Sequence, residues 1–133
     1  MYNIYYQEYF AVCKGPVESF LDIFLNSGAN INDSNNDVWS PLNKMVKERR
    51  KLSKEEIQYM ISKGADPNYC PSGCKSPLIH ALLRGETIIA ETLVAAGAQV
   101  NYMTESGQTA LNVALRYLSR SRKTIFSKSN TCR

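Results

Sequence analysis

The stretch "GADPNYCPSGCKSPLIHAL", residues 64–82, contains two short strings that recur elsewhere in the chain. The first string, "GADPN" at 64–68, has counterparts in "GANIN" at 28–32 and "GAQVN" at 97–101. Their glycines are 36 and 33 residues apart. A mark that returns at nearly constant spacing suggests a chain built from repeated structural units.

The second string begins the helical part of each unit. It reads "SPLNKM" at 40–45, "SPLIHA" at 76–81 and "TALNVA" at 109–114, again at spacings of 36 and 33 residues. Two independent marks that keep one period are hard to obtain by chance. The sequence therefore predicts at least three consecutive units of similar structure.

Each mark has a physical role at a helix end. The glycine of the first string follows an apolar helical run, where it can take a positive φ and end the helix. The Ser or Thr of the second string can cap a helix N-terminus, and the following proline at 41 and 77 suits the first helical position. Ser53 with Glu56 predicts a capping box and a further helix start between the marks. The predicted unit is helix, short break, helix and an extended turn.

This pattern resembles the ankyrin repeat. The resemblance covers nearly the whole chain and is best over residues 66–117, where "GxTAL" appears at Gly107–Leu111 and "LLxxGAxxN" at Leu93–Asn101, with valine at the second leucine. It implies an all-α fold, an ankyrin-repeat solenoid of stacked helix-turn-helix units with short extended turns. The sequence departs from the pattern where a glycine is expected before the cap and a histidine after "TPL". The residues found there are Val38 and Cys74, and Asn43, Ile79 and Asn112.

The resemblance divides residues 1–133, taken as a single domain, into four units. They are an N-terminal capping unit at 1–32, repeats at 33–68 and 69–101, and a C-terminal capping unit at 102–133. An aromatic stripe at helical spacing, from Tyr2 to Cys13, predicts a first inner helix. In the last unit we expect an inner helix over 109–119 and a short outer helix over 121–128 that covers the end of the core.

The composition is that of an ordinary globular chain, with 44% hydrophobic and 21% charged residues among 133. No apolar run approaches the roughly 18 residues of a membrane span, and the N-terminus lacks the features of a secretory signal. We therefore expect a cytoplasmic protein, or one in the host cytoplasm or nucleus if it is a viral or bacterial effector. The four cysteines are then expected as free thiols.

Cys70, Cys74 and His80 raise the question of a metal site. A zinc site needs about four ligands, and Asp66 is the only nearby carboxylate. Plain turn thiols are the favoured interpretation, with metal binding and a redox pair as alternatives. No serine or cysteine has a visible base and orienting acid. The sequence thus predicts no enzyme, no cofactor and no metal.

The resemblance implies binding of another protein through a concave groove, by turn tips and the exposed ends of the inner helices. Carried onto this chain, the partner-binding positions are Asp37, Trp39, Lys47, Lys75, Leu83, Arg84, Glu105, Gln108, Arg116 and Tyr117. Trp39 is expected as an interface anchor, with packing back on the first unit as the alternative. Three of the cations, Lys47, Arg84 and Arg116, would form a basic column joined by Lys75, or be unrelated solvated charges.

The expected partner is a protein with an acidic or mixed segment, and the chain itself is expected to be monomeric. Residues 106–133 hold six Lys or Arg and no Asp or Glu, whereas residues 1–105 hold ten against twelve. The alternative function is therefore binding of nucleic acid or an anionic surface through the basic C-terminal stretch.

Overall fold

The computed structural model describes residues 17–34, 39–48, 51–70 and 75–131. The described part holds six helices and, apart from an isolated bridge between Met103 and Thr109, no strand pairing. The helices are α2 (Val17–Asn26), α3 (Pro41–Glu48), α4 (Lys54–Ser62), α5 (Pro77–Leu83), α6 (Thr87–Ala95) and α7 (Ala110–Thr131). The predicted all-α class is confirmed at this level. The aromatic stripe at residues 2–13 lies outside the described residues.

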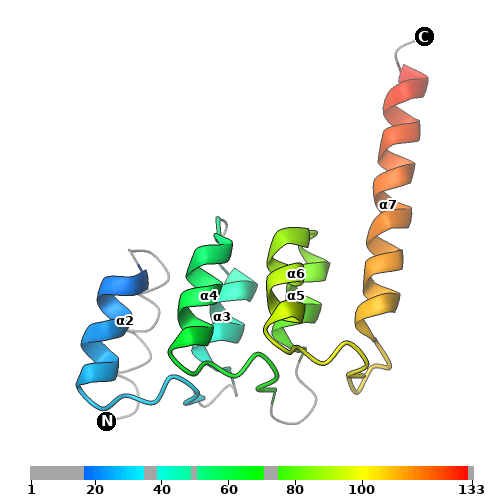
Figure 1. Ribbon diagram of the computed structural model, residues 1–133. Helices are drawn as coiled ribbons and strands as arrows, with labels where there is room; N and C mark the ends of the chain where they lie inside the picture. Colours follow the sequence, from blue (N-terminus) through cyan, green and yellow to red (C-terminus); the bar gives the residue numbers. More distant parts are fainter. Residues whose placement is uncertain (1–16, 35–38, 49–50, 71–74, 132–133) are drawn as a thin grey trace.

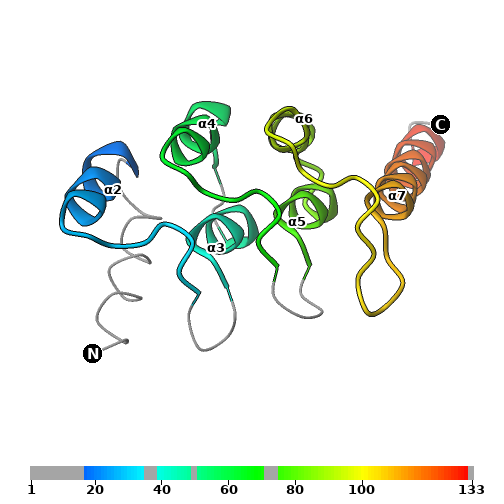
Figure 2. The ribbon, with the colours of Figure 1, turned by 60° about the horizontal axis from the view of Figure 1, so that its bottom comes forward.

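The helices stand side by side in two rows (Figures 1 and 2). The inner row consists of α3, α5 and α7, in which α5 packs against both neighbours. The outer row consists of α2, α4 and α6, which pack in that order, and α6 also packs on α5. The two rows enclose one apolar core, whose most buried large side chains are Leu21, Leu42, Met45, Ile57, Met60 and Leu93.

Each outer-row helix ends in the same way. Gly28, Gly64 and Gly97 have φ values of 92°, 97° and 98°, as the sequence predicts for residues that end a helix. After each glycine, the next N–H donates back to the carbonyl five residues earlier, as in Ala65 to Met60 at 3.0 Å. This bonding is the Schellman arrangement, which satisfies the last carbonyls of the helix.

The helix starts also agree with the sequence. Ser76 and Thr109 accept the N–H three residues ahead, at 3.4 and 3.3 Å, and Ser40 does the same for Asn43 at 3.3 Å. Ser53 and Glu56 form the predicted capping box, with bonds of 3.2 and 3.0 Å. The caps therefore fix where α3, α4, α5 and α7 begin.

An asparagine at the end of each first string connects successive turns. The Asn32 side chain donates to the Gly64 carbonyl at 2.9 Å and accepts from the Asp66 N–H at 2.8 Å. Asn68 repeats this one unit later, with Gly97 at 2.9 Å and Gln99 at 2.7 Å. The turns are therefore held in register by side-chain bonds to the backbone of the next unit.

The C-terminal segment differs from the prediction. The sequence predicts an inner helix over 109–119 and a separate outer helix over 121–128, but the structure has one continuous helix, α7. The physical reason lies in the segment between the expected helices, which contains no glycine or proline to break the backbone pattern, whereas Gly85 separates α5 from α6. No helix in the described part is both long enough and apolar enough to cross a membrane.

Candidate binding surface on the inner row

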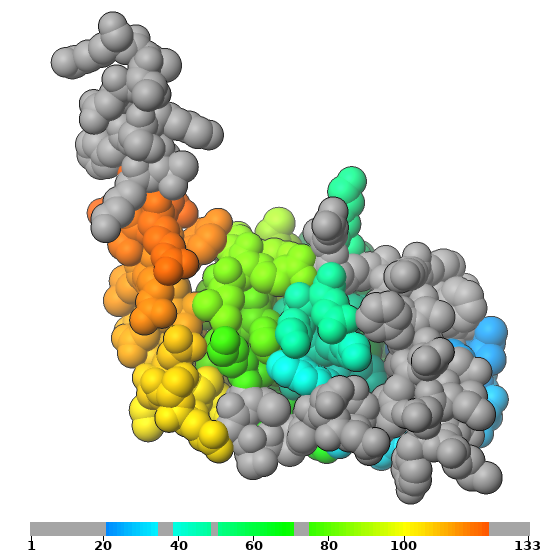
Figure 3. Space-filling view, turned by 180° about the vertical axis from the view of Figure 1, so that it is seen from behind, coloured from blue at the N-terminus to red at the C-terminus, as the bar shows by residue number. Residues whose placement is uncertain are grey.

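The inner-row helices form the face seen in Figure 3, with α7 at one end. Trp39 directly precedes Ser40, the cap of α3, and is half-buried. Its ring lies 5.2 Å from the His80 ring of α5, centroid to centroid, at an interplanar angle of 48°. The Lys47 Nζ atom stands 4.2 Å from the centroid of the Trp39 ring, in the geometry of a cation–π contact. Trp39 thus packs on the following unit and keeps part of its ring exposed.

His80 lies beneath this contact and is 7% exposed. Burial and, to a smaller extent, the charges of Lys47, Lys75 and Arg84 together lower the pKa of His80 to about 4. The imidazole is therefore neutral at physiological pH. Its Nε2 atom is buried without a hydrogen-bond partner among the described residues. Three of the four predicted cations thus act electrostatically on this one histidine; Arg116 of α7 is not among them.

We call Trp39, Lys47, Lys75, His80 and Arg84 the Trp39 patch. It combines a partly exposed aromatic ring with the exposed cations Lys47 and Lys75. Positive charges beside an exposed apolar ring attract acidic groups electrostatically.

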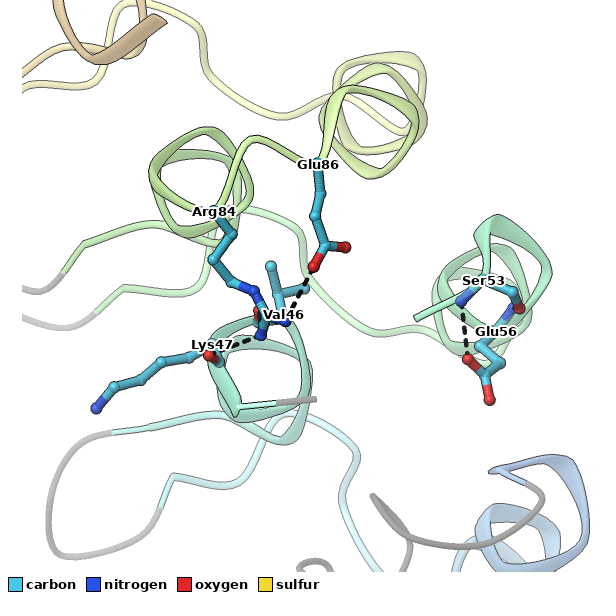
Figure 4. Close-up of polar contacts among 6 residues, drawn as sticks. All are labelled: Val46, Lys47, Ser53, Glu56, Arg84 and Glu86. Atoms are coloured by element: carbon cyan, nitrogen blue, oxygen red, sulfur yellow. Dashed lines mark hydrogen bonds and ion pairs between the residues drawn. The ribbon is translucent and has the colours of Figure 1, made fainter. Parts of the chain in front are cut away.

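Arg84 has a second role within the chain (Figure 4). Its guanidinium donates to the carbonyls of Val46 at 3.1 Å and Lys47 at 2.9 Å, in the last turn of α3. It also pairs with Glu86 at 3.0 Å, and both side chains are about one-quarter exposed. Arg84 therefore stabilises the C-terminal end of α3, where a cation also meets the helix dipole favourably. The charge of Arg84 is partly neutralised by Glu86. The cations open to a partner are therefore Lys47 and Lys75. Figure 4 shows the Lys47 side chain extending away from Arg84.

The third projecting turn is closed by its own hydrogen bonds. The Thr104 N–H donates to the Gln108 carbonyl at 3.0 Å, and the Gln108 N–H donates to Thr104 Oγ1 at 3.0 Å. Glu105 and Ser106 are exposed at the tip, while Gln108 is half-buried. The predicted binding residue Asp37, at the tip of an earlier turn, lies outside the described residues.

The remaining predicted positions lie toward α7. Leu83 and Tyr117 are each 41% exposed, and Arg116 is exposed. The Tyr117 ring occupies the space that a Cβ atom on Gly85 would need, and Gly85 has a φ of 72°. The positive φ favours glycine there, and any Cβ would require the Tyr117 ring to move; Tyr117 thus forms a contact between α7 and the end of α5. The structure therefore places Lys47 on the Trp39 ring and Arg84 on the end of α3, and it places Tyr117 at a separate contact.

The cysteines that raised the metal question are described only in part. The Cys70 Sγ atom accepts a weak hydrogen bond from the Tyr102 hydroxyl, at 3.7 Å. The same interaction joins Tyr69 to Ser34 one unit earlier, at 3.2 Å. Cys70 thus occupies a repeated position between turns. Cys74 lies outside the described residues, and among the described residues no three His, Cys, Asp or Glu side chains gather as a metal site would require.

A shallow hollow of about 740 Å³ lies between the N-terminal ends of α4 and α6. Its lining includes Glu55, Glu86 and Glu91 with Lys54 as the cation. The carboxylates make this hollow unfavourable for an acidic segment. It therefore differs in charge from the Trp39 patch.

A search against protein-family models found no match for this chain, and a search against curated proteins found none either. The functional argument therefore depends on the chain's own residues. The sequence does not predict that the buried His80 ring packs against Trp39. The two residues belong to different units, and the sequence of one unit does not show which residue of the next unit it contacts.

Proposed function

We propose that this chain is an ankyrin-repeat protein that binds a partner protein and catalyses no reaction. The proposal is supported by helix pairs in two rows, by positive-φ glycines at the end of each outer-row helix and by asparagines that connect successive turns. Repeat units of this kind contact only their neighbours and present one extended face to a ligand. The proposed binding face is the inner row with its turn tips.

The observation that carries the proposal is the Trp39 patch. A half-buried tryptophan offers a large apolar area that a partner can cover, and such residues are frequent interface hot spots. Lys47, which contacts the ring, and Lys75, whose charge acts on His80 beneath it, are both exposed. A segment that places an apolar side chain on Trp39 and carboxylates on the two lysines would satisfy both features. We therefore propose an acidic or mixed segment of another protein as the ligand.

His80 supports a binding role over a catalytic one. It is the only histidine in the chain, and general acid–base catalysis at neutral pH favours a group whose pKa lies near 7. The pKa of His80 is lowered to about 4, and its ring is covered by Trp39. The imidazole is thus a weak base in a position suited to packing.

The experiment is a selection from a random peptide library displayed on phage, with the immobilised protein as the target. We expect the recovered peptides to be rich in Asp and Glu and to contain an apolar residue. Because Trp39 is the only tryptophan, its fluorescence measures the affinity of each synthetic peptide at the proposed site. The Lys47→Glu, Lys75→Glu double variant should weaken binding at least tenfold.

Lys54→Glu is the matched control, because Lys54 is an exposed lysine of the outer row and lines the acidic hollow. This variant should bind like the wild type. Recovery of peptides without acidic bias, or equal binding by the Lys47→Glu, Lys75→Glu variant, would contradict the proposal.

The alternative is binding of nucleic acid or an anionic surface by the C-terminal segment. It is favoured by five Lys or Arg residues in α7 and by the absence of Asp and Glu from residues 106–133. Binding through phosphates weakens steeply with salt, by a factor set by the number of ion contacts. Titration with a duplex DNA from 50 to 200 mM salt distinguishes the two, since the groove proposal predicts no measurable DNA affinity at 200 mM.

A further inference from the structure

One face of α7 is exposed, although the corresponding leucine is buried in the two earlier inner-row helices. Leu111 of the third string corresponds to Leu42 and Leu78 in the first two. Leu42 and Leu78 are 1% and 3% exposed, whereas Leu111 is 67% exposed. In the unit of α5, the outer-row helix α6 packs on the inner-row helix. In the described part of the chain α7 has no outer-row helix of its own, and Figure 2 shows the outer row ending at α6.

Two further leucines extend this exposed surface along the helix. Leu115 and Leu118 are 55% and 56% exposed, and they follow Leu111 at intervals of four and three residues. Residues at such spacing share one side of a helix. We call Leu111, Leu115 and Leu118 the leucine face. An exposed, contiguous apolar surface of this kind marks an interaction site more often than a solvated one.

The length of α7 adds to this argument. Its 22 residues span about 33 Å, whereas the 7 residues of α5 span about 10 Å, so most of α7 extends past its inner-row neighbour, as Figure 1 shows. Helices owe most of their stability in water to packing of an apolar face. The leucine face lies in the part of α7 beside α5 and ends with Leu118, where the extending part begins; a partner there would supply packing for the base of the extension.

Charge determines which partner fits. From residue 106 to the end of the chain there is no carboxylate side chain, and α7 carries Arg116, Arg120, Arg122, Lys123 and Lys128. Arg122 is exposed four residues after Leu118 and therefore continues the leucine face. Each copy of α7 has five Lys or Arg residues and no acidic one, so like charge opposes the approach of two copies. An acidic partner would instead be attracted by this net charge and oriented by Arg122, which shares the leucine face.

We propose that the leucine face of α7 docks an acidic amphipathic helix of a partner protein, in the place that an outer-row helix of the last unit would occupy. The partner helix presents apolar residues at intervals of three and four to the leucines and carries Asp or Glu toward Arg122. This surface faces the outer row, whereas the Trp39 patch belongs to the inner row. The inference is independent of the proposed groove function and gives the chain a second interaction surface.

The test is a selection from a library of 18-residue peptides with a fixed helical stripe of leucines and random residues at the flanking positions. We expect enrichment of Glu and Asp at the flanks, and a synthetic winner should bind the wild type at least tenfold more tightly than its Lys-for-Glu counterpart. Leu115→Glu with Leu118→Glu should abolish binding, and because both side chains are already exposed, the melting temperature should stay within a few degrees. Arg122→Glu should weaken binding and partly restore affinity for the lysine peptide.

Four outcomes would overturn the proposal. They are the absence of enrichment, equal binding of acidic and basic peptides, binding unaffected by the leucine substitutions, and a wild-type dimer in sedimentation that the leucine substitutions dissociate. The last would assign the leucine face to a second copy. Leucine-dependent binding to phosphatidylserine vesicles without peptide binding would assign it to a membrane surface and would equally contradict the proposal.

Discussion

Protonation of His80 should destabilise the fold over a defined pH range. Folding lowers the pKa of His80 from 6.5 to about 4, because the ring is buried and Lys47, Lys75 and Arg84 repel the imidazolium. Below pH 6.5 the unfolded chain therefore binds a proton that the folded chain does not. The stabilising contribution is complete above pH 6.5 and is lost progressively as the pH falls toward 4.

The two pKa values set the magnitude of this loss. Between pH 7 and pH 5 they correspond to about 2 kcal/mol of unfolding free energy if burial acts in full. Lys47 and Lys75 are exposed, and salt screens their contribution. We therefore expect a loss of about 1 to 2 kcal/mol at 0.15 M ionic strength.

The assay is urea unfolding at pH 7, 6 and 5, followed by circular dichroism, for the wild type and for His80→Phe. Phenylalanine keeps an aromatic ring against Trp39 but cannot be protonated. Carboxylates such as Asp22, whose pKa is lowered by its hydrogen bonds with Tyr59 and Lys63, titrate in both proteins and cancel in the difference. The wild type should lose stability relative to the variant as the pH falls. Parallel curves for the two proteins would refute the reasoning.

Three further substitutions test the repeat arrangement by thermal and urea unfolding. Asn68→Ala should lower the free energy of unfolding by about 1 to 2 kcal/mol, because it removes two hydrogen bonds to the next turn. Asn101 has no following turn in the described part, so Asn101→Ala should change the free energy of unfolding by less than about 0.5 kcal/mol. Gly85→Ala should cost about 2 kcal/mol or more, since a Cβ would meet the Tyr117 ring at a positive φ, and an unchanged melting temperature would contradict that contact. Leu78→Asp should unfold the chain while Leu111→Asp is tolerated, and a soluble, cooperatively melting Leu78→Asp would contradict the register.

Most of the helix ends could be predicted because they are encoded locally. A serine cap needs only its own side chain and the N–H three residues ahead, and a terminating glycine needs only its own φ. Ser53 and Gly64 thus define α4 from the sequence alone. The aligned strings do not decide burial in the same way, because Leu42 and Leu78 are buried whereas Leu111, at the same place in the third string, is exposed.

The error at the C-terminus has a different cause. The outer helix expected over 121–128 would close the core, but the preceding residues offer no turn residue with which to reverse the chain. Local backbone preference therefore prevails over the burial that a return helix would gain, and α7 continues to Thr131. The exposed leucine face is the consequence of this continuation.

The sequence predicted several residues of the Trp39 patch, but it did not predict which of them contact one another. Equivalent positions in successive units suggested that Lys47 and Arg84 lie near one another. Their different roles could be seen only in the structure. Arg84 donates to the carbonyls at the end of α3, whereas the Lys47 amino group lies over the Trp39 ring. The structure likewise shows that the buried His80 ring packs beneath the Trp39 ring.

The central claim is that the Trp39 patch binds an acidic segment of a partner protein. The most direct measurement is affinity capture from nuclease-treated extract of cells that contain this protein, comparing the wild type with Lys47→Glu, Lys75→Glu and with the Lys54→Glu control, each quantified by mass spectrometry. The account predicts a protein that the wild type and the control capture equally, that the double variant loses, and whose acidic segment quenches or shifts Trp39 fluorescence when added as a peptide. A partner captured equally by all three proteins, or capture that disappears with nuclease, would contradict it.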